Sequence, residues 1–396
     1  MKNILSGQLN LVVSCHYGFE ELLADELTSL GAENIELHNR AVVCVGNLAL
    51  VYKINYKSRL ALRVLIKIAT FEVPDGNTLY EEVYDLPWDE LIQPNNTITI
   101  NSICNQSAFD NSMFVSMRAK DAIADFFRHR TGIRPSVDNE HPDLRIQVHI
   151  FREQATVLLD SSGNSLHMRG YRIGVNKAPI NEVLAAGLIM KSGWTIDMPF
   201  YDPMCGSGTF LIEAAMMSTG TPAGFYRKEF GFERWKIYDE ETFIAIVQEA
   251  NAERKLKTNA PIEGSDSARK SLTIARDNIK NTDFSGIIKT ELADFETAEA
   301  PENPGTIIIN PPYGGRLDKD DIEVLYKRIG DTLKKNYGGH SAWIITANRE
   351  AAKHIGLHAT KKYIVFNGQL ECRFLKYDIY AGSKKVKQQV EEDNNN

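Results

Sequence analysis

Several features that define other protein classes are absent from this chain of 396 residues. Its five cysteines (Cys15, Cys44, Cys104, Cys205 and Cys372) are widely spaced and include no Cys-x-x-Cys pair. This argues against a disulfide framework and a cysteine-built zinc site, and it fits a reducing cytoplasm. No run approaches the roughly 18 apolar residues of a membrane helix, and the start of the chain lacks the apolar core of a signal peptide. With 45 Lys plus Arg against 52 Asp plus Glu, the net charge of −7 excludes a globally basic nucleic-acid-binding protein, though not a local basic patch.

The sequence also has none of the common motifs of hydrolases and metalloenzymes. It contains no His-Glu-x-x-His pair, no Walker loop and no Gly-x-Ser-x-Gly elbow, and its nine histidines are scattered. We therefore expect a cytoplasmic protein with no metal site and no membrane segment. At roughly 150 residues per domain, the length allows two or three domains.

Hydrophobic periodicity divides the chain near residue 165 into two parts. Before that point, residues 62–68 and 144–150 alternate as strands, and 112–131 has helical spacing that stops at Gly132. This irregular mixture predicts an α+β module, whereas the strand–helix alternation beyond residue 170 predicts an α/β region with a parallel, doubly wound sheet. We expect strands at 199–203, 261–265, 305–310 and 341–347, an antiparallel pair near 363–380, and a disordered polar tail at 383–396.

A glycine-rich turn follows the first strand of the α/β region. Residues 202–209 read Asp-Pro-Met-Cys-Gly-Ser-Gly-Thr and precede an apolar helix, at the strand end where doubly wound folds bind ligands. The candidate binding residues are Asp202, Cys205, Gly206, Ser207, Gly208 and Thr209. The third glycine of the dinucleotide fingerprint is missing, which disfavours NAD. A tight turn that only packs the helix on the sheet would have the same pattern.

Two further aspartates end the following strands. Asp266 could accept hydrogen bonds from ribose hydroxyls, although the same residue would also serve as the N-cap of the next helix. Asp294 and Phe295 could hold an adenine, with the carboxylate accepting from its amino group and the ring stacking on its face. A loop aspartate beside a core phenylalanine would explain this pair equally well.

The most specific motif is Asn310-Pro311-Pro312-Tyr313, which follows a buried strand. Two prolines stop the strand, and their missing N–H groups leave carbonyl oxygens free as acceptors. The Asn310 side-chain oxygen and the Pro311 carbonyl can therefore both accept from one planar NH2 group, and Tyr313 can stack on a base. The motif predicts a site that holds an exocyclic amine, not a hydrolytic site.

Basic residues gather at two places. Arg118, Lys120, Arg128 and Arg130 lie on the helix predicted at 112–131, where they could follow a phosphate backbone or form a solvated face. Arg169 and Arg172 lie at the junction of the two parts of the chain and are further candidates for RNA contact.

The stretch 223–259 is longer than one crossover helix requires, and it is rich in aromatic residues. We expect an insertion with a small aromatic core of its own.

Together, these motifs resemble a known family. The 202–209 loop, the Asn-Pro-Pro-Tyr-Gly motif, and an Arg-Gly-Tyr-Arg at 169–172 followed by Ala-Pro-Ile-Asn-Glu at 178–182 look like the THUMP-domain class I RNA methyltransferases that methylate guanine N2. Nearly the whole chain is similar to the N-terminal half of the bacterial 23S rRNA guanine-N2 methyltransferase L. The resemblance implies an α+β ferredoxin-like/THUMP module followed by a Rossmann-like class I methyltransferase domain. The implied bounds are 1–70 for the ferredoxin-like segment, 71–165 for the THUMP RNA-binding domain and 166–382 for the methyltransferase domain.

The resemblance also implies a role for each motif. The 202–209 loop would bind S-adenosylmethionine, Asp266 its ribose, Asp294 and Phe295 its adenine, and Ala178 with Pro179 would cover its methionine end. Asn310 to Tyr313 would hold the target base. The implied partner is RNA, and the expected reaction is methylation of guanine N2 in 23S rRNA. Guanine N2 of tRNA, adenine N6 of DNA, a protein glutamine, and a non-catalytic RNA-binding assembly factor remain as alternatives.

Overall fold

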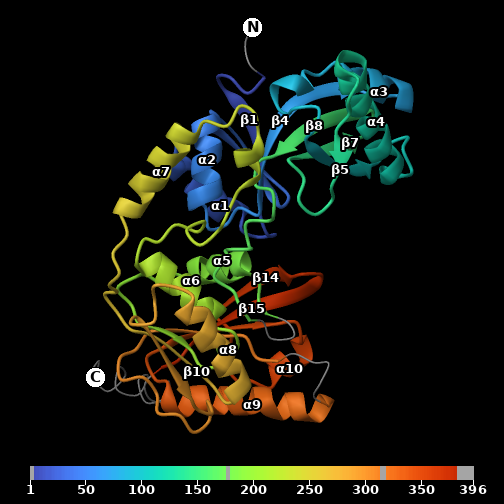
Figure 1. Cartoon of the computed structure of the whole chain (residues 1–396). Helices are drawn as coiled ribbons and strands as arrows, with labels where there is room; N and C mark the ends of the chain where they lie inside the picture. The colour runs from blue at the N-terminus through green and yellow to red at the C-terminus, as the bar shows by residue number, and fades with distance from the viewer. Residues whose placement is uncertain (1–3, 175–178, 313–317, 381–396) are drawn as a thin grey trace, which may run out of the picture. The chain divides into compact units, whose positions relative to one another are not determined.

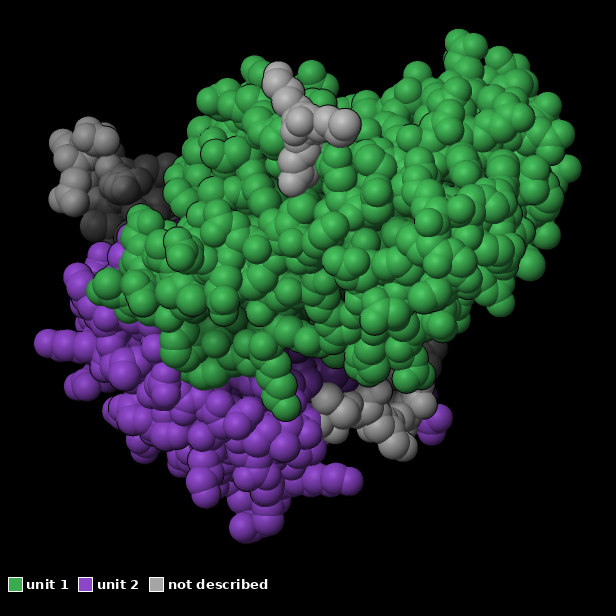
Figure 2. All heavy atoms as spheres, turned by 45° about the horizontal axis from the view of Figure 1, so that its top comes forward, with its two compact units in different colours: residues 1–15, 19–168, 223–252 green, residues 16–18, 169–222, 253–396 purple. Residues whose placement is uncertain are grey.

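The computed structural model describes residues 4–174, 179–312 and 318–380, which form two compact units (Figures 1 and 2). Unit 1 contains the chain up to residue 15, residues 19–168 and residues 223–252. Unit 2 contains residues 16–18, 169–222 and the chain from residue 253 onward.

Unit 1 is built on an eight-stranded sheet in the order β2-β3-β1-β4-β8-β7-β5-β6. All neighbours are antiparallel except β5, which runs parallel to β6 and β7. The pairing of β4 with β8 places Ile66 opposite Leu159 and so joins segments that are far apart in the sequence into one sheet. The strands are β1 (Leu9–Ser14), β2 (Glu33–His38), β3 (Ala41–Gly46), β4 (Arg63–Glu72), β5 (Thr97–Asn105), β6 (Ser136–Val137), β7 (Leu144–Phe151) and β8 (Gln154–Asp160).

The helices of unit 1 begin and end at residues with clear local causes. The helix α4 spans Ser112–Thr131 as the periodicity predicted, with the Asn111 side chain accepting from the N–H of Met113 at 2.9 Å and Gly132 in the left-handed region at its end. The other helices are α1 (Glu20–Leu30), α2 (Leu48–Lys57), α3 (Gly76–Tyr84) and α7 (Glu240–Ala252), with short 3-10 turns η1 (Trp88–Glu90) and η2 (Gly231–Arg234).

The aromatic residues from residue 223 pack against one another, but they share this core with α2, which corrects the expectation of a core of their own. The Phe232 ring lies 4.4 Å from the Tyr52 ring of α2 and 5.1 Å from Phe243 of α7, measured between centroids. Phe232 is fully buried in these contacts. One short 3-10 turn and one helix offer too little surface to bury such rings, so residues 223–252 pack on α2 and belong to unit 1.

Unit 2 has the doubly wound sheet that the strand–helix rhythm predicted. Its order is β11-β10-β9-β12-β13-β15-β14, with β9 to β13 parallel and the closing β14–β15 pair antiparallel. The strand order reverses at β9, which has β10 on one side and β12 on the other, so a ligand crevice is expected there. The strands are β9 (Phe200–Asp202), β10 (Ile262–Asp266), β11 (Ile288–Leu292), β12 (Thr306–Ile309), β13 (Ser341–Thr346), β14 (Lys361–Asn367) and β15 (Leu370–Asp378).

Helices cover both faces of this sheet. Figure 1 shows α6 (Thr209–Ser218) and α8 (Arg269–Lys280) on one face and α9 (Lys319–Asn336) on the other. Buried residues of α9, such as Tyr326 and Leu333, pack against Ile307 and Ile309 of β12. The remaining helices are α5 (Glu182–Ser192) and the short α10 (Arg349–Lys353).

Candidate active site

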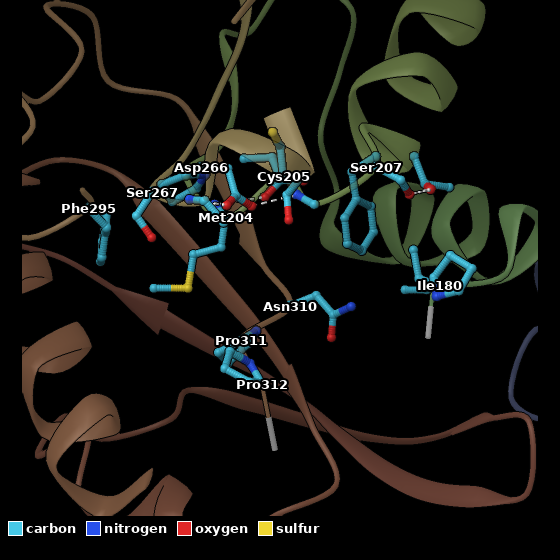
Figure 3. Close-up of a pocket in the computed structure, with 18 of the residues that line it drawn as sticks. Ile180, Met204, Cys205, Ser207, Asp266, Ser267, Phe295, Asn310, Pro311 and Pro312 are labelled. Atoms are coloured by element: carbon cyan, nitrogen blue, oxygen red, sulfur yellow. Dashed lines mark hydrogen bonds between the residues drawn. The ribbon is translucent and has the colours of Figure 1, made fainter. Parts of the chain in front are cut away.

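The loops that follow the parallel strands of unit 2 meet in one cavity of about 890 Å³ (Figure 3). Parallel strands bring their carboxyl ends to the same sheet edge, so motifs separated by about 100 residues become neighbours. The predicted residues that line the cavity are Pro179, Asp202, Cys205, Gly206, Ser207, Thr209, Asp266, Asp294, Phe295, Asn310, Pro311 and Pro312. Gly208 is the N-cap residue of α6. Ala178 and Tyr313 lie outside the described residues.

The glycine loop after β9 requires its glycines. Gly206 and Gly208 have φ values of 56° and 80°, which other residues rarely adopt. A Cβ atom on Gly208 would also lie 3.3 Å from the Cβ of Ala275 in α8. The glycines therefore let the loop turn sharply and pack closely on α8 while it lines the cavity.

Asp266 at the end of β10 fixes this loop. Its Oδ2 accepts from the N–H of Gly206 at 2.9 Å, and its Oδ1 accepts from the N–H of Ala268 at 2.8 Å. The N-cap residue of α8 is Ala268, so Asp266 is not the helix cap that the sequence left open as an alternative. Its carboxylate instead joins the second strand end to the glycine loop.

Asp202, the last residue of β9, is almost completely buried at 2% exposure. Its Oδ1 accepts from the N–H of Met204 at 3.3 Å, and this bond favours the ionised form. Burial outweighs the hydrogen bond and raises the pKa of Asp202 well above its usual range.

Asp294 and Phe295 lie on the far side of the cavity from Ile180 (Figure 3 labels Phe295). The Asp294 Oδ1 accepts from the N–H of Glu296 at 2.9 Å and so shapes the turn after β11. The Phe295 ring is 3% exposed and lies 5.2 Å from the Tyr337 ring. Phe295 is therefore a core residue that also lines the cavity.

Asn310 presents the most distinctive polar group of the site. Figure 3 shows its side chain extending into the cavity from the end of β12, beside Pro311 and Pro312. Its Oδ1 is buried and has no hydrogen-bond partner among the residues that the structure describes. A buried acceptor without a partner is costly, by about 1–3 kcal/mol, and the residue that carries it lines the cavity.

The two arginines at the junction point inward, which corrects their expected contact with RNA. Arg169 is 1% exposed, and its Nε lies 3.5 Å from Glu213 Oε1 in α6. The Arg172 Nε donates to Glu182 Oε1 at 2.8 Å, and its Nη atoms donate to hydroxyls of the glycine loop. Buried or engaged in this way, their guanidinium groups hold the protein together and do not face a nucleic acid.

The four basic residues of α4 do not form one stripe. At about 100° per residue, Arg118 and Lys120 lie roughly 160° apart around the helix. Lys120 pairs with Asp121 at 2.6 Å and Arg128 with Asp125 at 2.5 Å, while Arg130 lies over the Phe126 ring. Arg118 donates to the carbonyl of Gly76 at 2.9 Å. Only Arg128 and Arg130 of the four are exposed, and their contact with RNA stays a prediction.

Sequence reasoning missed several residues of the site. Ile180, Lys270 and the β14–β15 turn with Asn367, Gly368 and Leu370 also line the cavity. Asn278 is fully buried behind the glycine loop. It lies in the apolar stripe of α8, and a single polar residue in such a stripe was the signal that could have found it.

The described parts of the chain hold no cluster of three or more His, Cys, Asp or Glu residues that could bind a metal ion. Within the same residues, no helix combines the length and the apolarity needed to cross a membrane. All five cysteines are free.

Comparison with known proteins agrees with this architecture. Residues 169–376, which hold the whole cavity, match the family of RMKL-like methyltransferase domains. The chain belongs to this family. Upstream of the RMKL-like domain, residues 75–160 match the THUMP domain and residues 10–65 the RlmL ferredoxin-like domain. The resemblance and the fold class inferred from the motifs are thereby confirmed.

Named relatives are similar in sequence to most of this chain. The protein slr0064 of Synechocystis sp., provisionally named an RNA methyltransferase, is 38% identical over 364 residues, which are 92% of this chain and 95% of the relative. The ribosomal RNA large subunit methyltransferase K/L of Syntrophotalea carbinolica is 39% identical over 374 residues, which are 91% of this chain but 52% of that protein. The chain thus spans about half the length of this K/L relative.

A crystal structure supports the same assignment. SMU.472, provisionally described as a methyltransferase and crystallised with S-adenosylhomocysteine, has a TM-score of 0.85 and 29% sequence identity. The match covers 97% of this chain and 100% of SMU.472. The fold of this chain therefore occurs in a protein that was crystallised with a nucleoside ligand.

Proposed function

We propose that this protein is an S-adenosylmethionine-dependent RNA methyltransferase that modifies N2 of a guanine, with 23S ribosomal RNA as its substrate. The RMKL-like and THUMP domains and the names of the K/L relatives support the reaction and the substrate. The five free cysteines suit the cytoplasm, where we place this activity.

The cavity fits the proposed cofactor. Asp266 would hold the ribose, Asp294 and Phe295 the adenine, and the loop from Cys205 to Thr209 the rest of the molecule, with Pro179 over the methionine end. When bound, S-adenosylmethionine supplies an electrophilic methyl group. S-adenosylhomocysteine in SMU.472 is the product form of the same cofactor.

The unpartnered Oδ1 of Asn310 is the observation that carries the proposal. The exocyclic nitrogen of guanine is a weak nucleophile because its lone pair is delocalised into the ring. Asn310 Oδ1 and the Pro311 carbonyl can accept its two protons and so aim the lone pair at the methyl group. The same two oxygens stabilise the positive charge that develops on nitrogen. The proton becomes acidic after transfer, so no strong base and no metal ion is needed.

The target base must leave its stack to reach Asn310, as in other enzymes that modify bases. The sequence predicts that Tyr313 stacks on this base. The THUMP segment would bind the RNA around the target, with Arg128 and Arg130 as exposed cations on α4.

The test is transfer of a radiolabelled methyl group from S-adenosylmethionine to total RNA and, separately, to DNA, followed by digestion to nucleosides. Label in N2-methylguanosine from large-subunit rRNA is the expected result. Label in tRNA would change the substrate, and label in N6-methyladenine of DNA would replace the proposal. Label in neither nucleic acid would point to a protein glutamine, and failure to bind the cofactor would point to a non-catalytic assembly factor.

A further inference from the structure

Two polar side chains, the buried Asn278 and the partly buried Arg172, reach Ser207 of the glycine loop from different elements. Arg172, in the segment before α5, donates from Nη1 to Ser207 Oγ at 3.1 Å. Asn278, in α8, donates from Nδ2 to the carbonyl of Ser207 at 3.0 Å. Ser207 is 6% exposed and lines the cavity. Hydrogen bonds from the protein interior thus fix both the side chain and the backbone of Ser207.

The Arg172 guanidinium also joins two segments that line the cavity. Its Nη2 donates to Thr209 Oγ1 at 3.0 Å and to the carbonyl of Ile180 at 3.3 Å. Thr209 belongs to the glycine loop, and Ile180 lies on the same side of the cavity as Ser207 in Figure 3. The Nε bond to Glu182 Oε1 holds the guanidinium plane in this orientation. Only a planar fork of donors can make these contacts at once, so Lys would lose most of them.

Asn278 uses its full hydrogen-bonding capacity. Its Oδ1 accepts from the N–H groups of Ile173 at 2.8 Å and Gly174 at 3.1 Å, and its Nδ2 donates to the Gly174 and Ser207 carbonyls. The amide therefore ties the segment 172–174 to α8 and to the glycine loop. A buried amide with four bonds is the geometry of a fixed support.

We infer that Arg172 and Asn278 are positioning residues that keep the glycine loop in its cofactor-binding conformation through Ser207, an inference that rests on the proposed function of the cavity. Ser207 lines the cavity, and these bonds fix both its side chain and its carbonyl group there. Loss of either support lets the loop relax, and cofactor binding must then supply the cost of ordering it. Asn310 lies on the separate strand β12, so the methyl-transfer step itself is not affected once the cofactor is bound.

The test measures the Kd of S-adenosylmethionine by calorimetry, the kcat at saturating cofactor, and the melting temperature, all on the full chain. The variants are Arg172→Lys, which keeps a charge beside Glu182, Asn278→Ala, and the two combined. Each single variant should raise Kd about tenfold, as expected for the loss of the one or two hydrogen bonds that each side chain makes to the glycine loop. Because both act through Ser207, the combined variant should raise Kd by clearly less than the product of the two. The kcat should stay within about threefold of wild type.

Unit 1 provides a matched control for stability. Asn55 is also buried, at 1% exposure, and donates from Nδ2 to the Val51 carbonyl and to Ser161 Oγ, both at 2.9 Å. Asn55→Ala should lower the melting temperature as Asn278→Ala does, but leave Kd unchanged. Arg172→Lys keeps the test decisive if Asn278→Ala does not fold.

The outcomes distinguish a failure of this inference from a failure of the proposed function on which it rests. Wild-type protein that does not bind S-adenosylmethionine overturns the proposed function. Wild-type binding with an unchanged Kd in both single variants overturns the positioning roles. A similar rise of Kd in Asn55→Ala, or a fall in kcat without a change in Kd, overturns them as well.

Discussion

Substitution of Asn310 by Ala should separate activity from stability. Its buried Oδ1 has no partner among the described residues, and such an atom costs about 1–3 kcal/mol of folding free energy. Its removal should therefore leave the free energy of unfolding unchanged or slightly higher. Catalysis should fall, because one of the two acceptors that orient the amine is lost. Removal of one group that stabilises developing charge typically lowers kcat by about 100- to 1,000-fold.

The assay is single-turnover transfer of a tritiated methyl group to an rRNA fragment, with cofactor affinity and urea unfolding measured on the same preparations. Asn310→Asp is the matched control, since it keeps an acceptor oxygen and nearly the same size. It should retain more activity than Asn310→Ala, and both should bind the cofactor as wild type does. Near-normal activity of Asn310→Ala would refute the reasoning. So would a loss of activity that only follows a loss of cofactor affinity or of stability.

Three further predictions concern the fold. Burial raises the pKa of Asp202 above its usual 3.8, so the folded protein keeps a proton that the unfolded chain has lost, and stability falls as pH rises from roughly 4 upward. Asp202→Asn should flatten this dependence in urea unfolding at several pH values. Phe232→Ala should cost about 3–5 kcal/mol in the same assay, with unchanged cofactor affinity, because the ring packs on α2. Cys104 is half-buried whereas the other four cysteines are buried, so Cys104 should react first with Ellman's reagent in the native protein, as peptide mass spectrometry would detect.

Local patterns in the sequence predicted individual elements well but not their partners. The apolar spacing of 112–131 and its Gly132 stop set the bounds of α4, because a helix depends on contacts between neighbouring residues. The pairing of β4 with β8 brings together residues some 90 positions apart, and no local pattern encodes it. The aromatic residues near 232 likewise predicted burial, but no local pattern indicated that α2 would be their packing partner.

The same difference between local patterns and distant partners holds for the residues of the site. The glycine loop and Asn310 could be placed because strand ends and turn residues have fixed consequences for the backbone. The orientation of Arg169 and Arg172 could not, because a charge in the sequence does not reveal which carboxylate it will meet. Glu213 and Glu182, their partners, lie on two different helices. The cavity-lining residues of the β14–β15 turn could not be predicted either, because that turn reaches the site only through the closing antiparallel pair.

The topology explains why donor and acceptor sites lie so close together. β9 is only three residues long, yet it pairs with β10 on one side and β12 on the other. Neighbouring strands are about 4.8 Å apart, so the loop after β9, Asp266 at the end of β10 and Asn310 after β12 occupy adjacent positions along one edge. The distance between the proposed methyl donor and the amine that receives it is thus fixed by strand pairing in the rigid sheet. Catalysis then requires only that the target base reach that edge of the sheet.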